Sequence, residues 1–173
     1  MFNPFTRIYR GALFAALVLT GFCGRALADE TNTYMIVDLS EGLTTTNNYP
    51  IAYANGEPAG VWTNSSYKTD KLVLRRISRG TFQMGSPESE IGRATNGVED
   101  VKAVIISNDF YIGIFELTEG QRSKILSGGT VGSDKPQISN GFSIGDFLRN
   151  LTNRTSSLPF SLPNEAQWEY ACR

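Results

Sequence analysis

Regular apolar patterns in this sequence are short, and turn-forming residues interrupt them. Strand-like runs cover residues 34–39, 71–77, 80–85, 101–106 and 110–115, and glycine, proline, serine and asparagine are frequent in the segments between them. The full chain has 173 residues, which suits one globular domain and leaves no room for a second of full size. We therefore expect a single loop-rich domain built from short elements.

Local signals predict how these elements begin and connect. Residues 101–106 and 110–115 are expected to form a hairpin, because Asn108 and Asp109 suit a turn between them. Three short helices should follow, each opened by a side-chain cap with a partner three positions on: Thr118 with Gln121, Ser143 with Asp146, and Asn164 with Gln167. The second should be an amphipathic packing helix, with apolar residues spaced at i, i+3, i+4 and i+7: Ile144, Phe147, Leu148 and Leu151.

The first 28 residues have the pattern of a signal peptide. Arg7 and Arg10 precede the apolar run 11–22, and small residues at 26 and 28 offer a cleavage site. The run is shorter than the roughly 20 residues of a membrane-spanning helix. We therefore expect a secreted or periplasmic protein that has no membrane segment once residues 1–28 are removed.

Composition excludes several classes of function. The formal net charge is −1 and no basic stripe is visible, so nucleic acid is not an expected partner. Histidine is absent, which rules out a Ser-His-Asp triad, a Cys-His pair and a histidine-ligated zinc site. Removal of the leader would also remove Cys23 and leave Cys172 as the only thiol, so no intramolecular disulfide is expected.

Three stretches in the second half resemble the sulfatase-modifying-factor family, whose members include formylglycine-generating enzymes. They are Arg-Gly-Thr-Phe-Gln-Met-Gly-Ser at 79–86, Asp-Phe-Tyr-Ile-Gly-Ile-Phe-Glu-Leu-Thr-Glu-Gly-Gln at 109–121, and Leu-Pro-Asn-Glu-Ala-Gln-Trp-Glu-Tyr-Ala-Cys-Arg at 162–173. We call them the first, second and third motifs. The chain departs from the family pattern at Asp100 and Lys102, where a proline and a histidine are common, and at 140–142.

The resemblance implies an α+β, irregular, loop-rich fold related to the C-type-lectin-like fold. It divides the chain into a signal peptide (1–28), an N-terminal extension with short strands and loops (29–70) and the N-terminal part of a sulfatase-modifying-factor-like domain (71–173). In formylglycine-generating members, two cysteines hold a copper ion, calcium is structural, and the chain oxidises a sulfatase cysteine with oxygen. Those cysteines and calcium ligands lie C-terminal to the third motif.

The resemblance therefore assigns no catalytic, cofactor-binding or metal-binding residue to this chain, and it leaves open whether the protein is an enzyme. We expect Cys172 to be a buried core thiol. For Glu116, Glu165 and Glu169 we favour capping, helix-dipole complementarity or an ion pair over acid–base catalysis.

Two functions remain as hypotheses. The first is an exported sulfatase-modifying-factor-like protein, without catalytic competence in this stretch, whose implied partner is a sulfatase. The second is a non-catalytic scaffold that binds a carbohydrate or protein ligand, in which Tyr49, Tyr53 and Trp62 could form part of the ligand surface; core packing is the favoured role of these aromatic residues. A sulfoxide-synthase relative would need histidine ligands, which the chain lacks.

Overall fold

The computed structural model describes residues 18–19, 32–44, 46–93, 97, 99–138 and 143–173. In this part of the chain the strands form a larger sheet in the order β3-β2-β4-β7-β1-β8 and a two-stranded ribbon, β5-β6. All their pairings are antiparallel, and the sheets combine with separate helices, as in an α+β protein.

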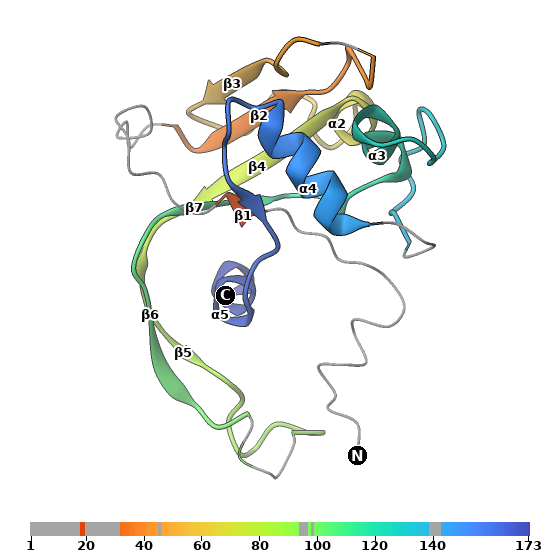
Figure 1. Cartoon of the computed structure of the whole chain (residues 1–173). Coiled ribbons are helices and arrows are strands. Elements are labelled where there is room, and N and C mark those ends of the chain that lie inside the picture. Colours follow the sequence, from red (N-terminus) through yellow and green to blue (C-terminus); the bar gives the residue numbers. More distant parts are fainter. Residues whose placement is uncertain (1–17, 20–31, 45, 94–96, 98, 139–142) are drawn as a thin grey trace.

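The strands are β1 (Val18–Leu19), β2 (Tyr34–Asp38), β3 (Ile51–Ala54), β4 (Lys71–Ile77), β5 (Gly80–Met84), β6 (Lys102–Ile106), β7 (Phe110–Gly113) and β8 (Phe160–Ser161). The helices are α2 (Ser66–Thr69), α3 (Glu119–Ile125), α4 (Ile144–Asn153) and α5 (Glu165–Cys172). In Figure 1, α3 and α4 lie over one face of the larger sheet, and the β5-β6 ribbon extends away from it.

The main core lies between the larger sheet and helices α3 and α4. Met35 and Leu74 come from paired strands and are fully buried. They belong to one apolar cluster with Ile125 of α3 and with Phe147 and Leu151 of α4. The residues 29–70, which the sequence sets apart as an extension, contribute β2 and β3 to the same sheet as β4.

The expected packing helix at residues 143–151 is confirmed as α4. The side chain of Ser143 accepts a hydrogen bond from the N–H of Asp146, as its cap pattern predicts. Phe147 and Leu151 are fully buried, because the helical period places them on the face that meets the sheet. The caps of α3 and α5 are confirmed as well, and each is a reciprocal capping box.

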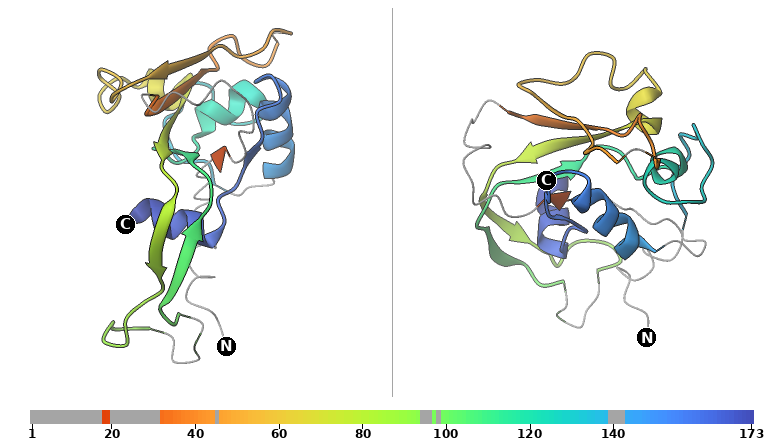
Figure 2. Two further views of the ribbon diagram at one scale, coloured as in Figure 1. Left: turned by 90° about the vertical axis from the view of Figure 1, so that its left-hand side faces the viewer. Right: turned by 45° about the horizontal axis from the view of Figure 1, so that its top comes forward.

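The expected hairpin of residues 101–106 and 110–115 is wrong. Strand β6 pairs with β5, whereas β7 pairs with β4 and β1. The two chain segments β4-β5 and β6-β7 run alongside each other as one long antiparallel pair that bends between its halves (Figures 1 and 2). The apolar pattern located both strands correctly. The two strands do not pair with each other, because each pairs with a strand that comes earlier in the sequence.

The bend contains one extra residue on one strand. Ile77 lies opposite Phe110 and Gly80 opposite Ile106, so two residues on the first segment face three on the second. An extra residue of this kind bends and twists an antiparallel pair. Asp109 is one of the three, and it accepts hydrogen bonds from the Nε of Arg76 at 2.9 Å and from the backbone N–H of Arg79 at 2.9 Å. Asp109, which the sequence assigns to a hairpin turn, therefore stabilises the bend between the two halves of the long strand pair.

Helix α5 lies against this bend. Its residues Trp168 and Ala171 pack on a second apolar cluster formed by Ile106, Phe110 and Ile112. Figure 2 shows α5 next to the β5-β6 ribbon and separate from the layer that contains α3 and α4. The fold thus has two cores that share β7, since Tyr111 belongs to the main cluster and its neighbours Phe110 and Ile112 belong to the second.

The predicted leader lies outside the described residues except for Val18 and Leu19. These two residues form β1, which pairs with β7 on one side and β8 on the other. No helix in the described part of the chain has the length and apolar character required to cross a membrane.

Candidate functional site

The first and third motifs pack against each other. The rings of Phe82 in β5 and Tyr170 in α5 have centroids 5.0 Å apart. The carboxylate of Glu169 accepts the backbone N–H of Gly85 at 2.8 Å, and Arg173 donates to the carbonyl of Gly85 at 2.8 Å. Arg173 also pairs with Glu169, with N and O 2.6 Å apart. We call this set of five residues the motif junction.

Two glycines of the first motif are required by close contacts. A Cβ atom at Gly80 would lie 2.3 Å from the hydroxyl oxygen of Tyr170. Gly85 has φ +108°, and a Cβ there would lie 2.7 Å from the carbonyl oxygen of Asp100. A side chain at Gly80 would require the Tyr170 ring to move, whereas at Gly85 it would meet backbone atoms and an unfavourable backbone conformation. These glycines serve the docking of α5 and the turn after β5.

The second motif contributes apolar residues to the second core and provides the N-terminal cap of α3. Phe110 and Ile112 are 2% and 8% exposed, and the third-motif residue Trp168 packs on their cluster. All three motifs therefore meet in the described structure. The sequence had shown only that they occur in the right order.

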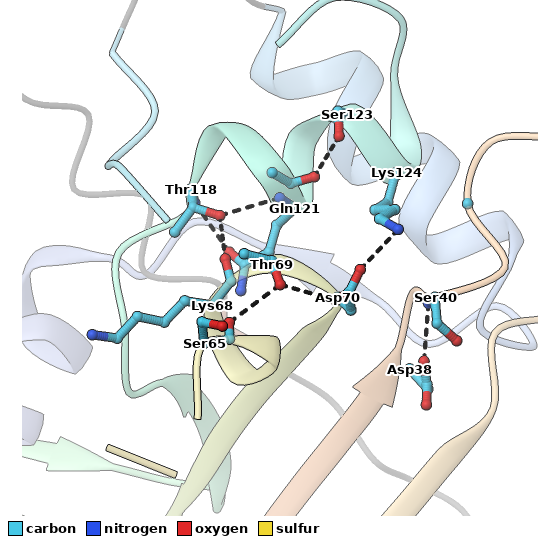
Figure 3. Close-up of polar contacts among 12 residues, drawn as sticks. Asp38, Ser40, Ser65, Lys68, Thr69, Asp70, Thr118, Gln121, Ser123 and Lys124 are labelled. Carbon is cyan, nitrogen blue, oxygen red and sulfur yellow. Dashed lines mark hydrogen bonds and ion pairs between the residues drawn. The ribbon is translucent and has the colours of Figure 1, made fainter. Parts of the chain in front are cut away.

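Thr118 and Gln121 of the second motif join α3 to α2 and β4 (Figure 3). The Thr118 hydroxyl accepts the N–H of Gln121 at 3.1 Å and donates to the carbonyl of Lys68 at 2.6 Å. The side-chain amide of Gln121 donates to the carbonyl of Lys71 at 2.7 Å. Beside them Lys124 pairs with Asp70 at 2.8 Å. Both motif residues are almost fully buried, so each of these bonds replaces water and their role is structural.

The three glutamates that the sequence singles out lie in different places. Glu169 takes part in the ion pair of the motif junction, as its favoured interpretation predicts. Glu165 lies in the first turn of α5, where a negative charge complements the helix dipole. Glu116 is half-buried between β7 and α3. The structure does not bring the three carboxylates together as a site.

The aromatic residues of the suggested ligand surface are separated as well. Tyr49 is 2% exposed and its hydroxyl donates to the carbonyl of Lys124 at 2.7 Å, which confirms a packing role. Tyr53 is half-buried against Tyr111, with ring centroids 6.5 Å apart. For Trp62 the packing role is wrong, because the residue is 59% exposed.

The exposed Trp62 belongs to a small group with the half-buried residues Phe115 and Lys68. Its ring meets that of Phe115 edge-on, with centroids 5.3 Å apart. The ammonium of Lys68 lies 4.9 Å from the centre of the same Phe115 ring. We call these three residues the Trp62 surface.

Acid should destabilise the bend through Asp109. The N–H of Arg79, together with the guanidinium of Arg76, holds the pKa of this carboxyl below its usual value, although partial burial opposes them. Its stabilising effect is therefore present above the unfolded-state pKa of about 3.9 and is lost as the pH falls through the lower folded-state pKa. We expect Asp109→Asn to lower stability at pH 7 and to flatten the decline of stability below about pH 4.

Urea unfolding curves measured between neutral pH and about pH 2.5 test this prediction. Asp134→Asn, which removes an exposed carboxylate, is the control and should leave the profile close to that of the original chain. An Asp109→Asn protein whose stability falls as steeply with acid as the original would contradict the assignment.

The expectation of a buried thiol at Cys172 is wrong, because Cys172 is exposed in the last turn of α5. The side of α5 that packs on the second core carries Trp168 and Ala171, and Cys172 falls outside that contact. Among the described residues no group of three His, Cys, Asp or Glu side chains is placed to hold a metal ion.

Comparison with known proteins finds no family model that matches the chain, no similar curated protein and no similar solved structure. The resemblance therefore rests on the three sequence motifs alone. What it implies about function is a proposal.

Proposed function

We propose that this chain is the N-terminal part of an exported sulfatase-modifying-factor-like protein, in which it forms scaffold and carries no reacting group. The observation that supports the proposal is the motif junction. Its first and third motifs are separated by more than 70 residues in sequence, and Glu169 bonds to Gly85 across a separation of 84 residues. A shared structural role explains why the motifs occur together.

The chemistry of the junction favours scaffold over catalysis. The carboxylate of Glu169 is already bound to Arg173 and to a backbone N–H, so it is not available as a free base. Cys172 is the one cysteine of the part of the chain that the structure describes, and it is exposed, whereas the copper chemistry implied by the resemblance needs two cysteines. The described residues do not fit such a site, and we derive no step through copper.

Two measurements test this proposal. The full chain, supplied with copper and oxygen, should not convert the cysteine of a sulfatase peptide to formylglycine, as judged by mass spectrometry. An authentic formylglycine-generating enzyme is the positive control. Conversion by this chain would overturn the scaffold role. In nuclear magnetic resonance spectra, contacts between the rings of Phe82 and Tyr170 should be present, and their absence would remove the support for the proposal.

The Trp62 surface favours a second candidate, a non-catalytic module that binds a carbohydrate or protein ligand. An exposed tryptophan next to a second aromatic ring can stack on the apolar face of a sugar. Trp62 lies on the loop before α2, so Trp62→Ala should leave the core intact. The only other tryptophan is Trp168, on α5.

Titration with a panel of neutral oligosaccharides, followed by tryptophan fluorescence, tests this candidate. Binding should weaken by roughly tenfold in Trp62→Ala, because the apolar face of the sugar would lose the large indole surface that covers it. Glu57→Ala is a control on the same loop, because Glu57 is exposed. A panel that leaves the fluorescence of the original chain unchanged would rule out oligosaccharides as the ligand.

A further inference from the structure

Strand β1 fills a space between two strands of the larger sheet that do not pair with each other. Val18 lies opposite Ile112 of β7 and opposite Ser161 of β8, while Leu19 lies opposite Tyr111 and Phe160. Both pairings are antiparallel. The two residues come from the apolar run that the sequence assigns to the leader. Part of the predicted signal peptide thus acts as an internal strand of the folded domain.

Backbone alternation shows which groups face this space. The N–H of Ile114 donates to the carbonyl of Val73 on β4 at 3.0 Å. Backbone groups of alternate residues point to the same side of a strand, so Ile112 also faces β4 and Tyr111 faces β1. On the other side the N–H of Phe160 is directed to the carbonyl of Leu158 at 2.9 Å, so Ser161 faces β1. We call the space between Tyr111 and Ser161 the strand slot.

An empty strand slot would take the partner strand away from the backbone groups of Tyr111 and Ser161, next to side chains that are buried while β1 is in place. Tyr111 and Phe160 are 4% and 7% exposed, and Ile112 is 8% exposed. A buried N–H or C=O that loses its hydrogen bond is costly, and apolar walls exclude a charged occupant. The slot therefore suits an extended backbone, like that of Val18–Leu19, in a segment without charged side chains.

We propose that the strand slot is a binding site for an extended apolar peptide segment. While the leader is attached, Val18–Leu19 occupies the slot; once the leader is removed, an apolar strand of a protein partner takes its place and runs antiparallel to both β7 and β8. Recognition is mainly through the backbone, as in other cases of strand addition. This inference rests on the leader that the proposed function includes, but it does not depend on the relationship to the enzyme family.

The test uses the full chain with the leader strand disabled. Leu19→Pro removes the N–H that faces Tyr111, whereas Leu19→Ala keeps it and serves as the matched control. The probe is a fluorescent peptide with the sequence of residues 13–22 and a lysine tail. A tethered strand competes at an effective concentration of about millimolar, so the free peptide should bind Leu19→Pro at least tenfold more tightly than the original chain or Leu19→Ala.

A second pair of variants locates the binding. In the Leu19→Pro background, Ser161→Pro removes the donor at the opposite edge of the slot and should abolish peptide binding, whereas Ser161→Ala should not. Equal binding by Leu19→Pro and the original chain would overturn the proposal. So would equal binding by the two Ser161 variants, or a dimer of Leu19→Pro that excludes the peptide, which would make a second copy the occupant.

Hydrogen exchange gives a result that does not depend on the peptide. The amide of Tyr111 faces the slot, so it should be protected in the original chain and exchange at least tenfold faster in Leu19→Pro. The amide of Ile112 faces β4 and should stay protected in both. Rapid exchange of Tyr111 in the original chain would show that the leader does not occupy the slot and would overturn the proposal.

Discussion

Replacing Phe147 with alanine is expected to lower the free energy of unfolding by about 3–5 kcal/mol. Phe147 is fully buried in α4 and belongs to the main apolar cluster with residues of β2, β4 and α3. The substitution removes a ring from a close-packed core, and the neighbours can fill the cavity only in part. Chemical denaturation followed by circular dichroism measures the change.

Arg149→Ala provides the matched control on the same helix. The side chain of Arg149 is 65% exposed and pairs with Asp146, one turn away. Surface ion pairs of this kind contribute little, and alanine favours the helix, so the change should stay within about 0.5 kcal/mol of zero. Similar losses for the two variants would mean that α4 does not form the centre of the core.

The second large effect is expected at Gly85. Gly85→Ala should lower the free energy of unfolding by about 2–4 kcal/mol, because it combines an unfavourable backbone conformation with a steric clash. The φ angle is +108°, and the added Cβ would lie 2.7 Å and 2.8 Å from the carbonyl oxygens of Asp100 and Glu99. Relief of the clash must move the turn that bonds to Glu169, so α5 should loosen.

Gly92→Ala separates the two causes. Gly92 has φ +88° and no atom within 4 Å of an added Cβ, so it carries the conformational cost alone. We expect a loss of about 1–2 kcal/mol for Gly92→Ala. With Trp62 replaced by phenylalanine, the fluorescence of Trp168 reports the docking of α5, and only Gly85→Ala should alter it in the folded state. Equal effects of the two variants would contradict the clash.

Local structure could be predicted well from the sequence. The caps at Thr118, Ser143 and Asn164 and the strand at residues 71–77 appear where the sequence places them. Each depends on residues a few positions apart. A cap needs one side chain and an N–H three residues on, and an amphipathic helix needs only the right spacing.

Contacts between distant segments could not be predicted in the same way. A two-residue period marks β6 and β7 as strands but does not state which strand each one pairs with. The exposure of Trp62 and Cys172 depends on whether a distant element covers them. The candidate site shows the same division, since the motifs are visible in the sequence while the bond from Gly85 to Glu169 is not.

The sequence by itself determined the short elements, their caps, the absence of histidine chemistry and the three motifs. The tertiary structure decided that β4-β5 and β6-β7 form one bent pair, that the motifs meet around α5, and that Val18–Leu19 lies between β7 and β8. The physical reason is the distance along the sequence over which each kind of interaction acts. Backbone conformation and capping follow from neighbouring residues, whereas strand pairing and burial are settled by competition among all segments for the same apolar surface and the same backbone hydrogen bonds.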